Sequence, residues 1–367
     1  MSYDGEARRD TPLALHLKER IKRHGPISVA AYMQACLSHP AHGYYRTRQA
    51  IGRDGDFVTA PEISQVFGEL IGLWCAVVWQ QMGQPSAFNF VELGPGRGTL
   101  MADALRAIRI VPGFHEAMRV WLVEPDPVLV SEQKAVLSKG GNAIGWVQHL
   151  AEVAMAPTVL IANEVLDTMP VSQLVRAAMG WRERGVGLDA AGKLVFCDLM
   201  QAPVMFLGAL DARASVDAVY ERRDDRALAY AMSRLAVSAP FAALLIDYGH
   251  VGPLMGESLQ AVRGHRYEHP LTSPGEADVT AQVDFAQVMR AAEGWGLRVD
   301  GPITQGELLG RLGIVERASR LMASNPARSG GIETGVARLM APGGMGGRFK
   351  ALGVRSAGMA ALPGLAR

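Results

Sequence analysis

The sequence predicts an α/β fold: a doubly wound, mainly parallel sheet with a helical N-terminal extension and an inserted antiparallel and helical subdomain. The core is predicted because short apolar strands alternate with helix-length segments between residues 88 and 162. A glycine-rich turn follows the first of these strands, as is typical of doubly wound sheets. The flanking parts are predicted by helical segments before residue 85 and by alternating apolar and polar residues after residue 172.

The composition is that of a folded globular protein. The 367 residues suffice for one large domain with insertions or for two smaller domains. Hydrophobic residues make up 49% and charged residues 20%, which excludes a largely disordered chain. The formal net charge of +1 gives no electrostatic footprint for nucleic acid. Cys36, Cys75 and Cys197 lie far apart and form no CxxC pair, which favours a reducing compartment over a disulfide scaffold or a zinc ribbon.

The sequence predicts a cytoplasmic protein that does not insert into a membrane. The N-terminus has no apolar stretch after its first charges, unlike a secretory signal. The longest uncharged apolar run, Leu70 to Trp79, has ten residues, about half of what spans a bilayer.

The helical extension is predicted over residues 1–85. Residues 11–38 predict two helices that are separated at Gly25-Pro26. Residues 39–60 are rich in Gly, Asp, Arg and Tyr and predict an irregular loop, whereas residues 62–82 predict a helix that is apolar on most faces and therefore buried.

The predicted core comprises residues 86–172 and 238–367. Its strands are predicted at Phe88–Leu93, Val120–Val123, Ala143–Val147, Thr158–Ala162, Ala242–Asp247, Leu297–Val299 and Arg348–Val354. The helices between them are predicted at Thr99–Ile110, Pro127–Leu137 and Phe285–Gly296. Because strands and helices alternate, these segments predict βαβ units and a parallel sheet.

Residues 173–237 predict an inserted subdomain that binds a substrate or a partner. Gln173–Ala177 and Trp181–Val186 alternate between apolar and polar residues, and a turn at Asp189–Lys193 leads into Leu194–Asp198. These segments predict an antiparallel meander, and the charged residues 208–237 predict helices after it.

The strongest chemical signal is Phe90-Val-Glu-Leu-Gly-Pro-Gly-Arg-Gly98. Gly94 lets the chain turn sharply after the strand, Gly96 lets backbone approach a ligand, and the following helix offers free N–H donors. Gly94, Pro95 and Gly96 are predicted to bind the cofactor. Dinucleotide enzymes would need glycine at position 99, which is threonine here. Glu92 suits the ammonium group of S-adenosylmethionine and would repel a pyrophosphate. The turn therefore predicts S-adenosylmethionine as cofactor, with a dinucleotide or a turn without ligand as alternatives.

Polar residues also follow the later strands, at the edge where doubly wound sheets bind ligands. Glu124 follows the second strand and is predicted to accept hydrogen bonds from the ribose hydroxyls of the cofactor. Trp146, near the end of the third, is predicted equally well as an adenine contact or a core residue. After the fourth, Asn163 is predicted to contact the cofactor, and Glu164 and Asp167 are predicted to face the methyl acceptor. Helix capping is the alternative for Asn163 and Asp167.

Two motifs are predicted to carry no chemistry. His265-Arg-Tyr-Glu-His269 matches a zinc motif that requires a helix, but Gly264 precedes it and Pro270 follows it, so no metal site is predicted. Ser131-Glu-Gln-Lys134 matches a serine-enzyme motif without its supporting motifs and predicts a helix surface.

In combination, the motifs resemble the MidA-like family of class I methyltransferases, in order from about residue 25 to 354. The segments that carry the resemblance are Gly52-Arg-Asp-Gly-Asp-Phe57, Thr59-Ala-Pro-Glu-Ile-Ser-Gln-Val-Phe-Gly-Glu69, Val91-Glu-Leu-Gly-Pro-Gly-Arg-Gly-Thr-Leu100, Leu122-Val-Glu-Pro125, Ala162-Asn-Glu-Val-Leu-Asp167, Leu245-Ile-Asp-Tyr-Gly249, Leu259-Gln-Ala-Val262 and Val279-Thr-Ala-Gln-Val-Asp-Phe285. The family includes a mitochondrial complex I assembly factor, an arginine methyltransferase, and its bacterial relatives.

The resemblance implies a class I, Rossmann-like fold whose N-terminal extension closes over S-adenosylmethionine, with S-adenosylhomocysteine as product. For the mitochondrial member it implies methylation of an arginine ω-nitrogen on a complex I subunit. By position, Thr59, Pro61 and Glu62 should contact the cofactor, and Asp247 should border the acceptor site as a third catalytic candidate. The chain departs from the family pattern at three places, which are Ala60 for a usual Ser, Val165-Leu166 for a usual aromatic pair, and Gln282 for a frequent His.

These observations predict a methyltransferase that acts on a protein arginine, in which Glu164, Asp167 and Asp247 orient the guanidinium and take its proton. Two alternatives remain open at this point. Residues 173–237 could form a lid over a small-molecule acceptor, or the protein could be a non-catalytic assembly chaperone that binds the cofactor. A homodimer is also left open.

Overall fold

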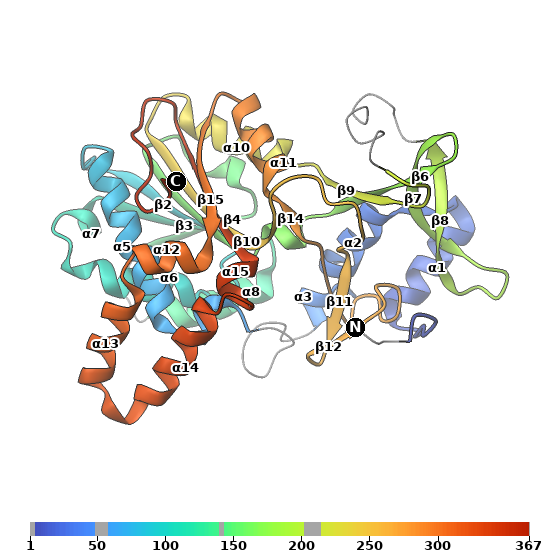
Figure 1. Cartoon of the computed structure of the whole chain (residues 1–367), viewed down its shortest axis with the longest axis horizontal. Coiled ribbons are helices and arrows are strands. Elements are labelled where there is room, and N and C mark those ends of the chain that lie inside the picture. Colours follow the sequence, from blue (N-terminus) through green and yellow to red (C-terminus); the bar gives the residue numbers. More distant parts are fainter. Residues whose placement is uncertain (1–3, 48–57, 139–142, 202–213, 367) are drawn as a thin grey trace. The chain divides into compact units, whose positions relative to one another are not determined.

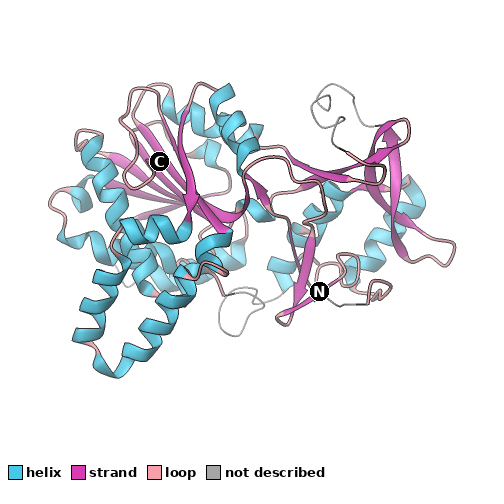
Figure 2. Ribbon diagram, in the orientation of Figure 1, coloured by secondary structure: helices cyan, strands magenta, loops and turns pink. Residues whose placement is uncertain are grey.

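The computed structural model describes residues 4–47, 58–138, 143–201 and 214–366 (Figures 1 and 2). The predicted Gly52–Phe57 motif and the start of the predicted 208–237 helices lie outside the described residues. The chain divides into two compact units, which we describe separately. Unit 1 comprises Met1–Phe57, Asp167–Asp224 and Gly252–Gln282, and unit 2 comprises Val58–Leu166, Asp225–Val251 and Val283–Arg367.

Unit 2 is built on a mixed sheet with the strand order β15-β16-β10-β5-β2-β3-β4. The strands are β2 (Phe88–Leu93), β3 (Met118–Val123), β4 (Ile144–Val147), β5 (Thr158–Asn163), β10 (Phe241–His250), β14 (Val283–Asp284), β15 (Arg298–Thr304) and β16 (Phe349–Arg355). Strands β4, β3, β2, β5 and β10 pair in parallel, whereas β16 is antiparallel to both of its neighbours. The order reverses between β2 and β5, so the predicted doubly wound core is confirmed.

The helices of unit 2 are α4 (Ala60–Ile63), α5 (Gln65–Gln81), α6 (Thr99–Ala107), α7 (Phe114–Ala117), α8 (Pro127–Leu137), α10 (Arg226–Ala236), α11 (Phe285–Gly294), α12 (Gln305–Arg311), α13 (Ile314–Ser324), α14 (Ser329–Met340) and α15 (Met345–Arg348). Short 3-10 turns lie at Ile108–Ile110, Leu150–Glu152 and Pro326–Arg328.

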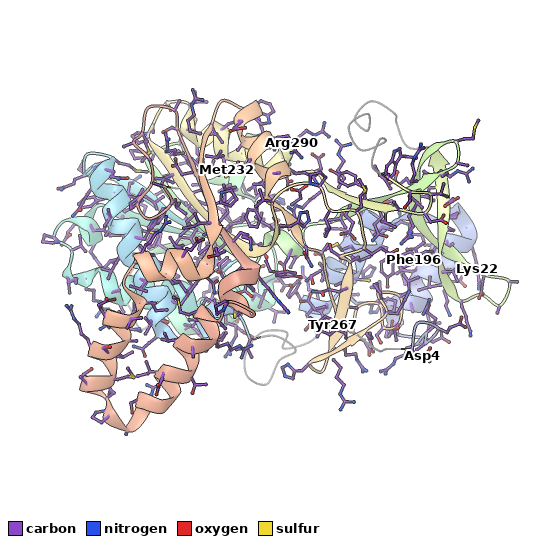
Figure 3. The ribbon with its side chains drawn as sticks, viewed as in Figure 1. Asp4, Lys22, Phe196, Met232, Tyr267 and Arg290 are labelled. Carbon is purple, nitrogen blue, oxygen red and sulfur yellow. The ribbon has the colours of Figure 1, made fainter. Side chains whose placement is uncertain are left out.

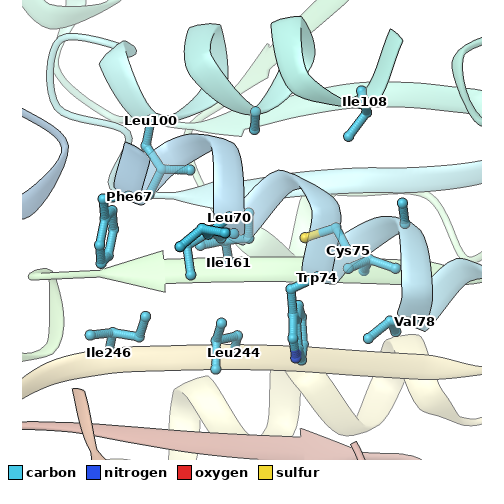
Figure 4. Packing of buried hydrophobic residues seen from close by; sticks show 14 of the residues in the cluster. Phe67, Leu70, Trp74, Cys75, Val78, Leu100, Ile108, Ile161, Leu244 and Ile246 are labelled. Atoms are coloured by element: carbon cyan, nitrogen blue, oxygen red, sulfur yellow. The ribbon is translucent and has the colours of Figure 1, made fainter. Parts of the chain in front are cut away.

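Helix α5 belongs to the core, although residues 1–85 were predicted as a separate extension. Its apolar residues, including Phe67, Leu70 and Trp74, lie over Ile161 of β5 and Leu244 of β10 (Figure 4). A helix that is apolar on most faces is stable in water only when other elements cover those faces. This burial explains why the boundary falls at residue 58 rather than at residue 85.

The charged segment before β10 contains a strand as well as the predicted helix. Val219–Arg223 forms β9, which pairs antiparallel with β6 (Val171–Ala177) of unit 1. The helical prediction was wrong there because the pairing, which the local charge pattern does not reveal, decides the structure. Helix α10 follows and packs on β10 and α11 through residues such as Met232, which is 1% exposed and is labelled in Figure 3.

Unit 1 combines helices with two antiparallel sheets. Its helices are α1 (Pro12–His24), α2 (Val29–Ser38) and α3 (Tyr44–Thr47). The larger sheet has the order β1-β7-β6-β9, with β8 on β7, and the smaller has the order β12-β11-β13. Their remaining strands are β1 (Ile27–Ser28), β7 (Gly180–Leu188), β8 (Leu194–Gln201), β11 (Gln260–Arg263), β12 (Arg266–Glu268) and β13 (Asp278–Thr280). The predicted antiparallel meander is therefore present.

The N-terminal helices pack on this antiparallel part of the chain. Leu17 of α1 and Met33 of α2 share one buried cluster with Val186 of β7 and Val279 of β13. The Tyr32 hydroxyl also donates to the Pro270 carbonyl at 2.7 Å. These contacts place residues 252–282 in unit 1, whereas the predicted core included them.

The residues of the apparent zinc motif lie in a β-hairpin rather than on a helix. Strand β12 carries the middle of the motif and pairs with β11. Within the described residues, no group of three or more His, Cys, Asp or Glu side chains is arranged to hold a metal ion. No helix in the described ranges is long and apolar enough to cross a membrane.

Candidate active site

The glycine turn after β2 has the geometry that the sequence predicts. Gly94, Gly96 and Gly98 have positive φ angles of 63°, 52° and 83°, which glycine adopts without steric cost. The Gly98 N–H donates to the Pro95 carbonyl at 2.8 Å and closes the turn. Helix α6 begins at the next residue, so its first N–H groups lie at the carboxyl end of β2.

Replacing Gly94 by alanine is expected to destabilise the protein by about 2–4 kcal/mol. A Cβ atom at this position would lie 2.5 Å from Cγ2 of Val165, and the positive φ adds its own cost. Gly83→Ala is the matched control, since φ is 85° there but no atom lies within 4 Å of the added Cβ. Urea unfolding should show the larger loss for Gly94→Ala. Equal losses would contradict a role for the contact with Val165.

Glu92 is a buried carboxyl group next to this turn. Its side chain is 3% exposed, and its Oε2 atom has no hydrogen-bond partner within the described residues. Burial raises the pKa of Glu92 to about 8, against a smaller opposing effect of the Met101 N–H. A buried acceptor without a partner is energetically costly, so a cationic ligand group beside it would be strongly favoured.

Hydrogen bonds hold the segment that precedes α5 at the carboxyl ends of β2 and β5. Thr59 is the N-cap of α4 but makes no capping hydrogen bond. Oε1 of Glu164 accepts the Ala60 N–H instead, at 2.8 Å. Oε1 of Glu62 accepts the Thr99 hydroxyl at 2.5 Å, at the start of α6. Pro61, between them, is buried. The predicted cofactor residues of this segment thus lie beside the glycine turn and the end of β5.

Glu124 follows β3 and is held at both carboxylate oxygens. Its Oε1 accepts the Asp126 N–H at 2.9 Å, and its Oε2 accepts the side-chain amide of Gln133 at 3.3 Å. The Ser131–Lys134 motif predicted that Gln133 lies on a helix surface, but Gln133 is 0% exposed. The prediction was wrong because α8 turns the face of Gln133 and Leu137 inward. The four-residue spacing of Gln133 and Leu137, which places both on one helix face, was the signal in the sequence for this burial.

The residues at and after the end of β5 differ in their exposure and in their contacts. Asn163 is 8% exposed, and its Oδ1 atom has no hydrogen-bond partner within the described part of the chain. Its Nδ2 donates to Oε1 of Glu164 at 3.1 Å. Glu164 is half-buried and has a φ of 53°, which is unusual for a residue other than glycine. Asp167 is 6% exposed and is the first residue of the second segment of unit 1. Its carbonyl accepts the Ala281 N–H.

Asp247, near the end of β10, is fully buried. Its Oδ2 accepts the Leu166 N–H at 2.9 Å, and its Oδ1 accepts the Tyr248 N–H at 2.8 Å. The carboxylate therefore fixes the backbone that leaves β5 relative to the end of β10.

Replacing Asp247 by asparagine is expected to cost about 3 kcal/mol of stability, because one oxygen cannot accept both backbone N–H groups and the new NH₂ group would face a donor. Asp198→Asn is the matched control, since this carboxylate pairs with Arg182 at an exposed position and should contribute at most about 1 kcal/mol. Denaturant unfolding checks both variants. A loss at Asp247 no larger than at Asp198 would argue against the anchoring role.

A model of an S-adenosyl-L-methionine-dependent methyltransferase family matches residues 70–303, more than half of the chain. The chain belongs to this methyltransferase family. S-adenosylmethionine is therefore its cofactor, and the residues fit that molecule: Glu92 offers a buried carboxyl for an ammonium group, and Glu124 offers a fixed carboxylate for hydroxyl groups.

Named relatives of this methyltransferase cover nearly all of it. The mitochondrial protein arginine methyltransferase NDUFAF7 of Mus musculus is 35% identical over 376 residues, which is 94% of this chain and 84% of the mouse protein. The same protein of Homo sapiens is 34% identical over 92% of this chain and 82% of its own. A Burkholderia thailandensis protein solved with S-adenosyl-homocysteine bound superposes with a TM-score of 0.87 and 27% identity, covering 99% of this chain and 98% of its own.

Proposed function

We propose that this methyltransferase transfers a methyl group to an arginine side chain of a protein. The observation that carries the proposal is the 34–35% identity, over more than nine-tenths of the chain, to proteins that are named protein arginine methyltransferases. The chemistry of the acidic residues that follow β5 and lie near the end of β10 supports it. An arginine guanidinium stays protonated and presents a planar set of donors, so an acceptor site for it needs carboxylates.

Glu164 is the group that we assign to the acceptor guanidinium. It is half-buried, unlike Asp247, and its backbone is held in a left-handed conformation, as is common for residues at functional sites. Asn163 and the Ala60 N–H both donate to its Oε1, which fixes the direction of the carboxylate. When bound, S-adenosylmethionine supplies an electrophilic methyl group on a sulfonium sulfur. Glu164 orients the attacking nitrogen and takes the proton that this nitrogen loses.

We assign different roles to the other two acidic residues. Asp247 is a positioning residue, because it is fully buried and acts on the acceptor site through the Leu166 backbone. Asp167 follows Leu166 directly and remains a second candidate for contact with the acceptor. The acceptor that we propose is an arginine on a complex I subunit, in keeping with the family resemblance. The homodimer and the cytoplasmic location remain predictions. The relatives named above are mitochondrial proteins.

Methyl-labelled S-adenosylmethionine tests the proposal directly. The protein is incubated with it and with lysate of a strain that lacks the protein, and label in macromolecules is separated from label in small molecules. We expect one labelled protein whose label maps to an arginine, and no label with Glu164→Gln. Label confined to small molecules would overturn the proposal and favour a small-molecule methyltransferase. The absence of any label, with cofactor binding shown by calorimetry, would favour a non-catalytic chaperone.

A further inference from the structure

Gln133 of α8 makes three hydrogen bonds from one fully buried side-chain amide. Its Nε2 donates to the Gly96 carbonyl at 2.8 Å and to Oε2 of Glu124 at 3.3 Å. Its Oε1 accepts the Trp146 indole N–H at 3.0 Å. An amide offers two N–H donors and a separate carbonyl acceptor without a charge, so it can satisfy all three partners in the interior.

The three partners belong to segments at the carboxyl ends of three adjacent strands. Gly96 lies in the turn after β2, Glu124 follows β3, and Trp146 lies in β4. Helix α8 packs closely on the turn, since a Cβ at Gly98 would lie 3.6 Å from Cα of Gln133. One side chain of α8 therefore links the glycine turn, the candidate ribose carboxylate and the candidate adenine contact.

We infer that Gln133 is a positioning residue for the ribose of the cofactor, acting through Glu124. The Asp126 N–H holds one oxygen of Glu124, and Gln133 holds the other, so the carboxylate is fixed in one orientation before the ribose arrives. Preorganised acceptors lose little entropy when the ligand binds. The inference concerns cofactor binding alone and does not depend on the identity of the methyl acceptor.

Calorimetry with two probes tests this role. The probes are S-adenosylhomocysteine and its 2′-deoxy analogue, which lacks one ribose hydroxyl. Gln133→Met keeps the length of the side chain and removes its hydrogen bonds. We expect the Kd of S-adenosylhomocysteine to rise about tenfold, with a much smaller change for the 2′-deoxy analogue. The ratio of the two affinities should therefore fall toward one.

Two further variants keep the test decisive. Ser131→Ala changes an exposed residue of the same helix and should leave both affinities unchanged. If Gln133→Met does not fold, Trp146→Phe removes the indole donor that holds the amide, and the affinity ratio should again fall. An equal loss for both probes would leave the affinity ratio unchanged, indicate a merely structural role and overturn the inference. Wild-type affinity for both probes would overturn it as well. Because no methyl transfer is measured, failure here leaves the proposed acceptor untouched.

Discussion

Replacing Glu92 by glutamine is expected to weaken cofactor binding strongly and to make the unliganded protein more stable at pH 8. The affinity for S-adenosylhomocysteine should fall about a hundredfold or more, because a buried carboxylate that pairs with a ligand ammonium group is lost. The stability at pH 8 should rise because glutamine cannot ionise, whereas the wild-type carboxyl group is 3% exposed and burial opposes its ionisation.

The pH dependence follows from the raised pKa of Glu92. Its folded pKa of about 8 lies above the ordinary value of 4.5, so the folded protein keeps a proton that the unfolded chain releases. The free energy of unfolding linked to this proton is fully present below pH 4.5. Between pH 4.5 and pH 8 it falls by about 1.4 kcal/mol per pH unit. The free energy of unfolding of Glu92→Gln should not show this decrease with pH.

Cofactor affinity should depend on pH in the opposite direction. A ligand ammonium group favours the Glu92 carboxylate, so binding below pH 8 must release its proton. The wild-type affinity for the cofactor should therefore rise between pH 6 and pH 8, by up to about tenfold per pH unit. The affinity of Glu92→Gln should not rise over this range.

Calorimetry and urea unfolding at pH 6 and pH 8 measure both effects. Glu333→Gln, at an exposed position of α14, is the matched control. The role of Glu92 would have to be abandoned if Glu92→Gln bound S-adenosylhomocysteine as tightly as wild type at pH 8.

The sequence could predict the parts of the site that depend on local patterns. The turn at Gly94 and Gly96 is such a part, since its positive φ angles demand glycine. The strand ends that carry Glu92 and Glu124 follow from apolar runs of strand length. Both features are encoded within a few consecutive residues, so no knowledge of distant contacts was needed.

The parts that escaped prediction depend on contacts between distant segments. Gln133 was predicted as a surface residue because its three partners lie in other segments, namely the glycine turn, the end of β3 and strand β4. The sequence predicted Asp247 as a catalytic candidate. It could not predict that the carboxylate accepts the N–H of Leu166, which lies 81 residues earlier in the chain. Likewise, the N-terminal helices could be recognised as helices, but not that they pack on β7 and β13.

Replacing Glu164 by glutamine is expected to reduce kcat by about 10²–10⁴-fold and to leave the Kd of S-adenosylhomocysteine unchanged. Glutamine keeps the size of the side chain and an oxygen that can accept the Ala60 N–H, so α4 should stay in place. It cannot take a proton from the acceptor nitrogen, and it removes the charge that attracts a guanidinium.

The two measurements separate catalysis from support of the fold. Glu333→Gln again serves as the control, and its kcat should equal that of the wild type. If Glu164→Gln weakens cofactor binding as much as it slows transfer, Glu164 acts mainly by capping α4. If it keeps full turnover with unchanged binding, Glu164 does not accept the proton, and the role passes to Asp167. A selective loss of kcat is the one outcome that requires the Glu164 carboxylate at the methyl acceptor.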